Sequence, residues 1–258
     1  MTENLSKGTP LLAARHLVFG RSRPLSAPLS FTVSRGEILA LLGMNGRGKT
    51  TLLDTLAGIL PPISGTVERA ARAGYVPQKF ATALAYTVFD IVLMGRARDV
   101  GVFELPKPED ERAALAALER LGIAELAPRP FSALSGGQQQ LVVIARALAG
   151  GSGLLLLDEP TAALDLRRQE AVMTLLQGLA AEGVGIVFST HDPMHAGLIA
   201  DKAVVLLPEG RNAVGAACDA LTPELLERAY GVPIDAVPGR AGEAARLVPD
   251  FHIGQRPK

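Results

Sequence analysis

Residues 38–50 read Ile-Leu-Ala-Leu-Leu-Gly-Met-Asn-Gly-Arg-Gly-Lys-Thr. The first five are apolar and end at a glycine, a pattern that predicts a short buried strand over 38–42. A helical pattern starts after the glycines and stops at another glycine, which predicts a helix over 50–58. A strand followed by a loop and a helix is the repeating unit of α/β proteins, so this stretch favours an α/β fold.

The loop in this stretch has the spacing Gly-x-x-x-x-Gly-Lys-Thr, which is typical of a phosphate-binding P-loop. Its glycines let several backbone N–H groups converge on phosphate oxygens, and the helix that follows presents its positive end to the same anion. Lys49 adds charge at the β- and γ-phosphates of ATP, and Thr50 offers a hydroxyl to Mg²⁺. A chance glycine-rich turn is the alternative, and the flanking strand and helix argue against it. The candidate ATP-binding residues of this loop are Gly43, Asn45, Gly46, Gly48, Lys49, Thr50 and Thr51.

Two carboxylates follow a second apolar run. Leucines at 154–157 predict a buried strand, and Asp158 and Glu159 come directly after it. A carboxylate at the C-terminal edge of a strand is well placed to reach a metal ion beside a P-loop. We therefore expect Asp158 to hold Mg²⁺ and Glu159 to act as the general base that polarises the attacking water.

Other patterns describe the rest of the chain. Apolar runs predict strands at 153–157, 185–189 and 203–207, and helical periodicity predicts helices at 109–121, 138–149, 169–182 and 223–230. Strands that alternate with helices indicate a mainly parallel sheet covered on both faces. Alternating residues at 30–33 and 65–68 suggest an N-terminal antiparallel element. We interpret 1–258 as a single domain, with a helical insertion at about 85–150 and a looser tail at about 210–258.

Composition excludes several classes. Lys plus Arg and Asp plus Glu number 26 each, and this neutrality argues against nucleic acid as a partner. The single cysteine, Cys218, cannot form an internal disulfide and has no zinc-ligand spacing around it. The first ten residues lack the pattern of a signal peptide. No apolar run approaches the roughly 20 residues that cross a bilayer, so a membrane function would require separate spanning chains.

A third motif narrows the class. Leu134-Ser135-Gly136-Gly137-Gln138 resembles the signature motif of ABC ATPases. The resemblance implies a P-loop NTPase core of the RecA-like type, with backbone N–H groups and Ser135 binding a γ-phosphate at the N-terminus of a helix. An ordinary Ser/Gly helix cap is the alternative.

The resemblance to ABC ATPases extends over nearly the whole chain. Gln78 resembles the Q-loop glutamine that senses Mg²⁺ and the transmembrane partner, and Asp165, after Ala163 and Leu164, resembles the D-loop aspartate. His191 resembles the switch histidine at the γ-phosphate. Phe19 occupies the position of the aromatic residue that stacks on adenine, where the family usually has Tyr. Gln139 is a departure, since the family often has Arg there.

The family mechanism supplies the expected partners. Two copies of the chain pair head to tail, and each ATP lies between the P-loop of one copy and the Ser135 segment of the other. Closure is driven by the higher affinity of ATP for the closed dimer. The motion is passed to transmembrane permease subunits at the cytoplasmic face of the inner membrane, with a substrate-binding protein acting indirectly. Residues 78–103 are the expected permease-facing surface, with Asp90 and Arg96 as its test positions if they are exposed.

Two further stretches, residues 87–96 and 221–232, resemble ATPases of importers for metal chelates, namely iron-siderophore, haem, cobalamin or molybdate systems. A core helix and a C-terminal capping helix are the structural alternatives for these stretches. Three rival functions stay open: a soluble ABC ATPase without a transport role, an exporter cassette, and a nucleotide-binding module that does not hydrolyse ATP. The presence of Glu159 and His191 counts against the last of these.

Overall fold

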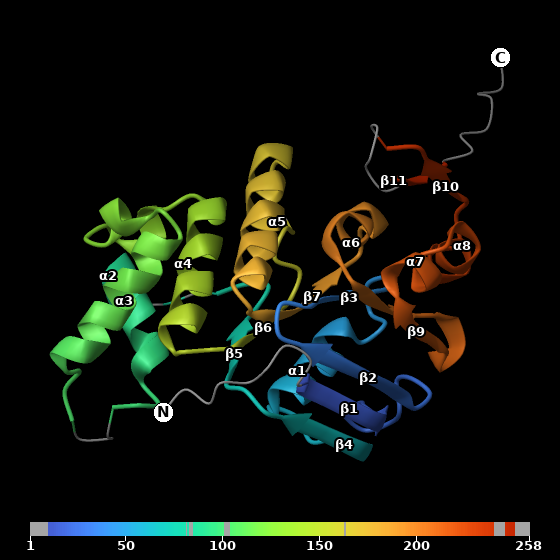
Figure 1. Cartoon of the computed structure of the whole chain (residues 1–258), viewed down its shortest axis with the longest axis horizontal. Coiled ribbons are helices and arrows are strands. Elements are labelled where there is room, and N and C mark those ends of the chain that lie inside the picture. The colour runs from blue at the N-terminus through green and yellow to red at the C-terminus, as the bar shows by residue number, and fades with distance from the viewer. Residues whose placement is uncertain are drawn as a thin grey trace. The chain divides into compact units, whose positions relative to one another are not determined.

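The computed structural model of the chain describes residues 10–80, 82, 85–100, 104–162, 164–239 and 246–250 (Figure 1). The chain forms two compact units, each assembled from separate segments. The first unit is built mainly from Glu68–Phe188, and the second from Ala13–Phe31, Glu37–Val67 and Ser189–Lys258. Each unit contains parallel strands and helices, which confirms the expected α/β class.

The first unit has three neighbouring parallel strands. These are β5 (Ala73–Val76), β6 (Leu154–Leu157) and β7 (Gly185–Thr190), the last two residues of which belong to the second unit, and β6 pairs with both others. All four leucines of β6 are fully buried. Burying each such side chain contributes roughly 2 kcal/mol, so this strand is a main source of core stability. Helix α5 (Leu166–Ala181) lies between β6 and β7 in the chain, as parallel strands require a crossover connection.

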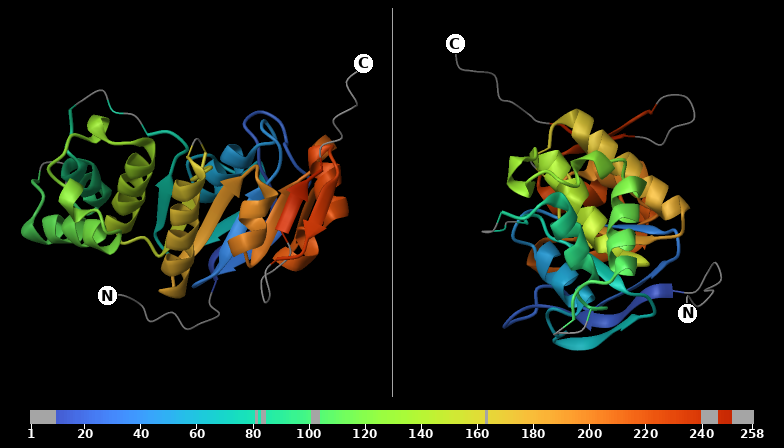
Figure 2. Two further views of the ribbon diagram at one scale, coloured as in Figure 1. Left: turned by 90° about the horizontal axis from the view of Figure 1, so that it is seen from above. Right: turned by 90° about the vertical axis from the view of Figure 1, so that its left-hand side faces the viewer.

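Helices dominate the segment between β5 and β6, as expected. They are α2 (Val88–Leu93), η1 (Met94–Arg96), α3 (Pro108–Arg120), η2 (Ala124–Leu126), η3 (Phe131–Ala133) and α4 (Gly136–Ala149). Helices α2, α3 and α4 pack against one another, and Figure 2 shows them gathered into one group, coloured green. Thr87 starts α2 with a capping box that Asp90 completes.

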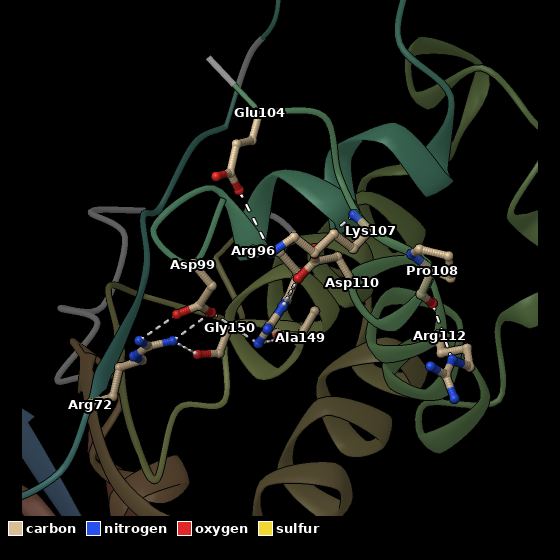
Figure 3. Close-up of polar contacts among 10 residues, drawn as sticks. All are labelled: Arg72, Arg96, Asp99, Glu104, Lys107, Pro108, Asp110, Arg112, Ala149 and Gly150. Carbon is tan, nitrogen blue, oxygen red and sulfur yellow. Dashed lines mark hydrogen bonds and ion pairs between the residues drawn. The ribbon is translucent and has the colours of Figure 1, made fainter. Parts of the chain in front are cut away.

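An ion-pair network joins this group of helices to the chain around β5 (Figure 3). Arg72 donates two hydrogen bonds to Asp99, at 2.8 and 2.7 Å, and a third to the carbonyl oxygen of Gly150 at 2.8 Å. Arg96 lies 3.0 Å from Asp99 and donates to Asp110 at 2.9 Å. The segment after α2 is therefore held on two sides by charged contacts.

The second unit also has three neighbouring strands. β3 (Ile38–Leu42) pairs in parallel with β8 (Lys202–Leu206), which pairs in antiparallel fashion with β9 (Asn212–Ala216). Every residue of β3 is buried, and the carboxylate of Asp201 accepts a hydrogen bond from the backbone N–H of Ile38 at 2.8 Å. Helix α1 (Lys49–Ala57) follows β3 after the glycine-rich loop. The predicted strand–loop–helix unit is thus confirmed.

A separate three-stranded sheet has the order β2-β1-β4, with β1 at Pro10–Val18, β2 at Leu29–Ser34 and β4 at Ser64–Arg69. Its outer strands cover the alternating residues 30–33 and 65–68 of the sequence. The C-terminal part contains α6 (Pro193–Ile199), η4 (Pro208–Gly210), α7 (Ala217–Ala220), α8 (Pro223–Tyr230), β10 (Ile234–Val237) and β11 (Arg246–Pro249). Among the residues that the structure describes, no helix is long and apolar enough to cross a membrane.

Candidate functional site

The loop between β3 and α1 has the backbone that phosphate binding requires. Gly43, Gly46 and Gly48 have φ angles of 146°, 81° and 96°, a region that favours glycine. A Cβ atom at Gly43 would lie 3.0 Å from the carbonyl oxygen of Leu206, and one at Gly48 would lie 2.9 Å from Cδ1 of Leu25. Both the backbone conformation and the packing therefore call for glycine at these positions.

Lys49 is held against this loop. Its side chain is 5% exposed, and its ammonium group donates hydrogen bonds to the carbonyl oxygens of Gly43 at 2.8 Å and Met44 at 3.5 Å. A positive charge is thus fixed at the inner side of the loop, while Asn45 and Gly46 are exposed on its outer side. This arrangement fits an anion that approaches from solvent.

The start of α1 also fits a phosphate group. Gly48 is the N-cap residue and provides no capping side chain, and the first turn carries no acidic residue. The N–H groups of the first turn and the helix dipole both favour an anion at this end. Thr50 is exposed in this first turn, and Thr51 is half-buried. The loop and the helix start together fit the polyphosphate of a nucleotide, and the Thr50 hydroxyl is an oxygen of the type that binds Mg²⁺.

The acidic pair lies in the first unit, at the end of β6. Asp158 is 4% exposed, and its backbone N–H donates to the carbonyl oxygen of Val76 at 2.9 Å, which extends the pairing of β5 and β6 by one residue. Glu159 has a φ of 45°. This conformation is uncommon for a residue with a side chain and costs about 1 to 3 kcal/mol. Strain of this kind is characteristic of functional sites.

Gln78 meets Glu159 in the structure. The Nε2 atom of Gln78 donates a hydrogen bond to Oε2 of Glu159 at 3.5 Å, although 81 positions separate the two residues in the sequence. The sequence predicts both as site residues but gives no sign of their contact. Because β5 and β6 are neighbouring parallel strands, the chain leaves both at the same edge of the sheet, and this brings the two side chains together.

The Ser135 segment begins helix α4. The hydroxyl of Ser135 accepts from the backbone N–H of Gln138 at 3.4 Å, and the side-chain oxygen of Gln138 accepts from the backbone N–H of Ser135 at 3.1 Å. This is a capping box, so in the isolated chain Ser135 serves as an ordinary helix cap, which was the alternative to γ-phosphate binding. Gly136 is exposed, whereas Gly137 is buried.

Arg168 covers Gly137 and was not anticipated from the sequence. A Cβ atom at Gly137 would lie 2.8 Å from Cδ of Arg168. The Nε atom of Arg168 lies 3.3 Å from Oδ2 of Asp165, and the backbone N–H of Arg168 donates to Oδ1 of Asp165 at 2.9 Å. Asp165 is the N-cap of α5, whereas Ala163 lies outside the described residues. The sequence does carry a signal for the contact of Arg168 with Asp165, because the two residues are three positions apart just before a predicted helix.

His191 lies in the second unit, at the end of β7, and its side chain is exposed. The residues on either side of it are tied together, because the backbone N–H of Asp192 donates to Oγ1 of Thr190 at 3.0 Å. Asp192 then caps α6 by accepting from the backbone N–H of Met194 at 2.8 Å. The backbone of His191 is therefore held between the end of a strand and the start of a helix.

The proposed stacking role of Phe19 does not agree with the structure. Phe19 is fully buried, so its ring has no face open to an adenine base. Its Cε2 atom would lie 3.1 Å from a Cβ at Gly48, which places the ring directly against the P-loop. Phe19 therefore supports the phosphate-binding loop through packing, and the sequence position of an aromatic residue did not reveal this difference.

The loop before α1 defines a nucleotide-binding protein of the P-loop class. Comparison with known proteins is more specific: the family model described as ABC transporter matches residues 27–162. The molybdate import ATP-binding protein MolC of Haemophilus influenzae is 46% identical over 207 residues, which are 80% of this chain and 81% of that protein. The chain belongs to the ABC transporter family, as an ATPase domain.

Two more comparisons agree with this assignment. The hemin import ATP-binding protein HmuV of Thermobifida fusca is 37% identical over 254 residues, which are 91% of this chain and 87% of that protein. A solved chain of an ABC transporter described as of the metal-chelate type, in an inward-facing conformation, superimposes with a TM-score of 0.90 at 40% identity. That alignment covers 95% of this chain and 99% of the solved chain. The P-loop ABC ATPase fold predicted from the sequence is thus confirmed.

Proposed function

We propose that this chain is the ATP-hydrolysing subunit of an ABC importer that takes up a metal chelate or related metal-containing substrate through separate transmembrane subunits. The substrate class includes iron-siderophore, haem, cobalamin and molybdate. The names of the relatives that import molybdate and hemin support this class. The geometry of the loop before α1 is the observation that carries the nucleotide chemistry, because it combines a helix start that has no capping side chain with the fixed charge of Lys49.

Each site residue has a role that its surroundings support. Lys49 and the N–H groups at the start of α1 bind the phosphates, and Ser135 with its glycines binds the γ-phosphate of ATP held by a second copy. Glu159 accepts a proton from the attacking water, and the hydrogen bond from Gln78 orients its carboxylate. His191 contacts the γ-phosphate. Thr50, Gln78 and Asp158 are the residues that would hold Mg²⁺, and a bound Mg²⁺ would supply neutralisation of charge on the phosphates.

Pairing and membrane attachment complete the proposal. Two copies pair head to tail around two ATP molecules, and the pair binds permease subunits at the cytoplasmic face of the membrane. A groove of about 580 Å³ in the first unit is a suitable docking site, since Leu93, Met94, Ala97 and Val100 contribute to its lining. Most of its lining falls in the expected surface 78–103, and Glu104 and Pro106 extend beyond that surface. Residues 81, 83, 84 and 101–103 are outside the described residues.

Asp90 and Arg96 are unsuitable as test positions for docking. The carboxylate of Asp90 accepts hydrogen bonds from the backbone N–H and the hydroxyl of Thr87, at 2.8 and 2.7 Å. Arg96 contacts Asp99 and Asp110. Because both side chains are used inside the unit, reversing either charge would disturb the fold as well as any contact with a partner.

The variant Glu159→Gln tests the proposed chemistry. Removing the general base should lower the rate of Mg²⁺-dependent ATP hydrolysis by about 100-fold or more, while ATP still binds. The variant should therefore accumulate as an ATP-bound dimer, which size-exclusion chromatography with light scattering detects. The wild-type chain is the control, measured both alone and with its permease subunits. A wild type that binds ATP but fails to hydrolyse it in both settings would contradict the proposal.

A further inference from the structure

The two C-terminal strands form a pair with one packed face and one open face. β10 and β11 run antiparallel, with Ala236 opposite Leu247 and Asp235 opposite Val248. Successive residues of a strand point to opposite faces. Leu247 is 6% exposed and Val248 is 40% exposed, so Leu247 is on the packed face and Val248 is on the open face.

The packed face lies against helix α6. The two elements are in contact, and a Cβ atom at Gly197 of α6 would lie 3.3 Å from Cδ1 of Leu247. The absence of a side chain at Gly197 lets Leu247 reach close to the helix backbone. Leu247 therefore acts as a direct contact between the C-terminal strand pair and α6.

Helix α6 depends on such contacts for its position. It has only seven residues, and a helix of this length is marginal in water by itself. Within the second unit it also contacts β3, the strand that leads into the P-loop. The helix is thus packed by β3, α7 and β11, so the contact with β11 is one of those that fix its position.

The start of α6 is joined directly to His191. Asp192 caps the helix and is also bonded to Thr190, so the backbone of His191 is tied to the first turn of α6. A shift of the helix must therefore move His191. Misplacing a catalytic group by about 1 Å can reduce a rate by about 100-fold, so small shifts matter here.

We propose that the C-terminal strand pair β10–β11 positions His191 for ATP hydrolysis, by holding α6 through the contact of Leu247 with Gly197. This inference rests on the proposed ATPase function. It assigns Leu247 as a positioning residue that touches neither nucleotide nor metal. The strand pair affects the rate of hydrolysis only by fixing the position of His191.

Two variants of neighbouring residues test the contact. Leu247→Ala removes the side chain that reaches α6, and Val248→Ala makes a similar truncation on the open face of the same strand. We expect hydrogen–deuterium exchange in residues 193–199 to become about tenfold faster in Leu247→Ala and to stay unchanged in Val248→Ala. Unchanged exchange in Leu247→Ala, or equal acceleration in both variants, would overturn the inference. If Leu247→Ala does not fold, Leu247→Val provides a smaller truncation with the same expected direction.

Kinetics test whether the contact acts through His191. We expect Leu247→Ala to lower kcat for ATP hydrolysis about fivefold, with KM for ATP within about twofold of the wild type, whereas Leu247→Met retains the wild-type rate. In a His191→Ala background, adding Leu247→Ala should cause no further loss. Additive losses would show that Leu247 affects activity by another route and would overturn the proposal.

The two measurements separate this inference from the proposed function. A wild type that fails to hydrolyse ATP even with its permease subunits would refute the proposed function. The exchange of residues 193–199 would still show whether the strand pair holds α6, because that measurement needs no catalysis.

Discussion

Gly46 and Gly48 have similar backbone angles but different surroundings. Their φ angles are 81° and 96°. No atom lies within 4 Å of a Cβ built at Gly46, whereas one at Gly48 would lie 2.9 Å from Leu25 and 3.1 Å from Phe19. At the first position only the backbone conformation favours glycine, and at the second the packing does so as well.

This difference predicts unequal effects of alanine. We expect Gly46→Ala to lower the free energy of unfolding by about 1 kcal/mol, because alanine is strained at positive φ. Gly48→Ala should cost about 3 kcal/mol, since it adds a steric conflict with packed side chains to the same strain. Thermal unfolding without nucleotide measures both. Equal destabilisation by the two variants would contradict the role assigned to Leu25 and Phe19.

His195 gives the second unit a pH dependence. Burial lowers the pKa of His195, the neighbouring His191 lowers it further, and Asp192 opposes this by raising it. The pKa of His195 is therefore lower in the folded state than the value of about 6.5 expected in the unfolded chain. As the pH falls, the unfolded chain therefore binds a proton at His195 before the folded chain does. The free energy of unfolding is unaffected by this group above about pH 6.5 and decreases as the pH falls below that value.

The variant His195→Leu tests this dependence. We expect the free energy of unfolding of the wild type to fall between about pH 7.5 and 5.5, and the fall to be smaller in the variant, which has no proton to bind at this position. Urea denaturation at several pH values measures the difference. Identical pH profiles for the two proteins would show that His195 does not contribute.

At the scale of elements, the Arg72–Asp99 pair connects the chain before β5 to the segment after α2. The hydrogen bond from Arg72 is the main cause that lowers the pKa of Asp99. A hydrogen bond from the backbone N–H of Lys107 is the main cause that lowers the pKa of Asp110, and Arg96 adds to it. The stabilisation from both carboxylates is present above their unfolded pKa of about 4 and is lost as the pH falls through their lowered folded values.

A double-mutant cycle measures the pair. We expect Arg72→Ala and Asp99→Ala together to destabilise the chain less than the sum of the single variants, with a coupling of about 1 kcal/mol, because the side chains are 41% and 24% exposed. The coupling should decrease in high salt. The matched control is Arg98→Ala, an exposed arginine in the same segment, combined with Asp99→Ala. A coupling of zero for Arg72 and Asp99 would show that the network has no energetic effect.

At the scale of the whole molecule, a substitution in the proposed docking groove should impair transport and leave ATP hydrolysis intact. Met94 lines the groove and is 38% exposed. We expect Met94→Glu to leave ATP hydrolysis by the isolated chain within about twofold of the wild type, because the residue is outside the nucleotide site. Transport by the complete complex in liposomes should fall at least about tenfold, since docking would bury the new charge without a counter-charge placed to pair with it.

A second variant controls for a general effect of added surface charge on transport. Leu115→Glu places the same charge on α3 at another exposed apolar residue, which is 41% exposed and is not part of the groove lining. Equal loss of transport in both variants would indicate a general effect of surface charge. Parallel loss of hydrolysis and transport in Met94→Glu would argue against the groove as the docking site.

Local patterns were sufficient for most of the regular elements. The strand predicted at 38–42 matches β3, and the helix predicted at 223–230 matches α8. The predicted strand at 203–207 starts one residue later than β8. β10 and β11 were missed because each has only four residues and lies in a tail rich in proline and glycine. Each of these strands forms by pairing with the other, and a pattern of four residues is too short to reveal that pairing.

The family, the P-loop, the acidic pair and the α/β class follow from local sequence patterns, because each depends on residue types at short, regular spacing. The contacts between distant side chains come from the fold: Gln78 with Glu159, Leu247 with Gly197, and Phe19 with the P-loop. Burial also depends on the complete fold, and it removed Phe19 from the candidate stacking residues. Contacts between residues far apart in the chain arise from strand order and packing, and neither is encoded in any single stretch of sequence.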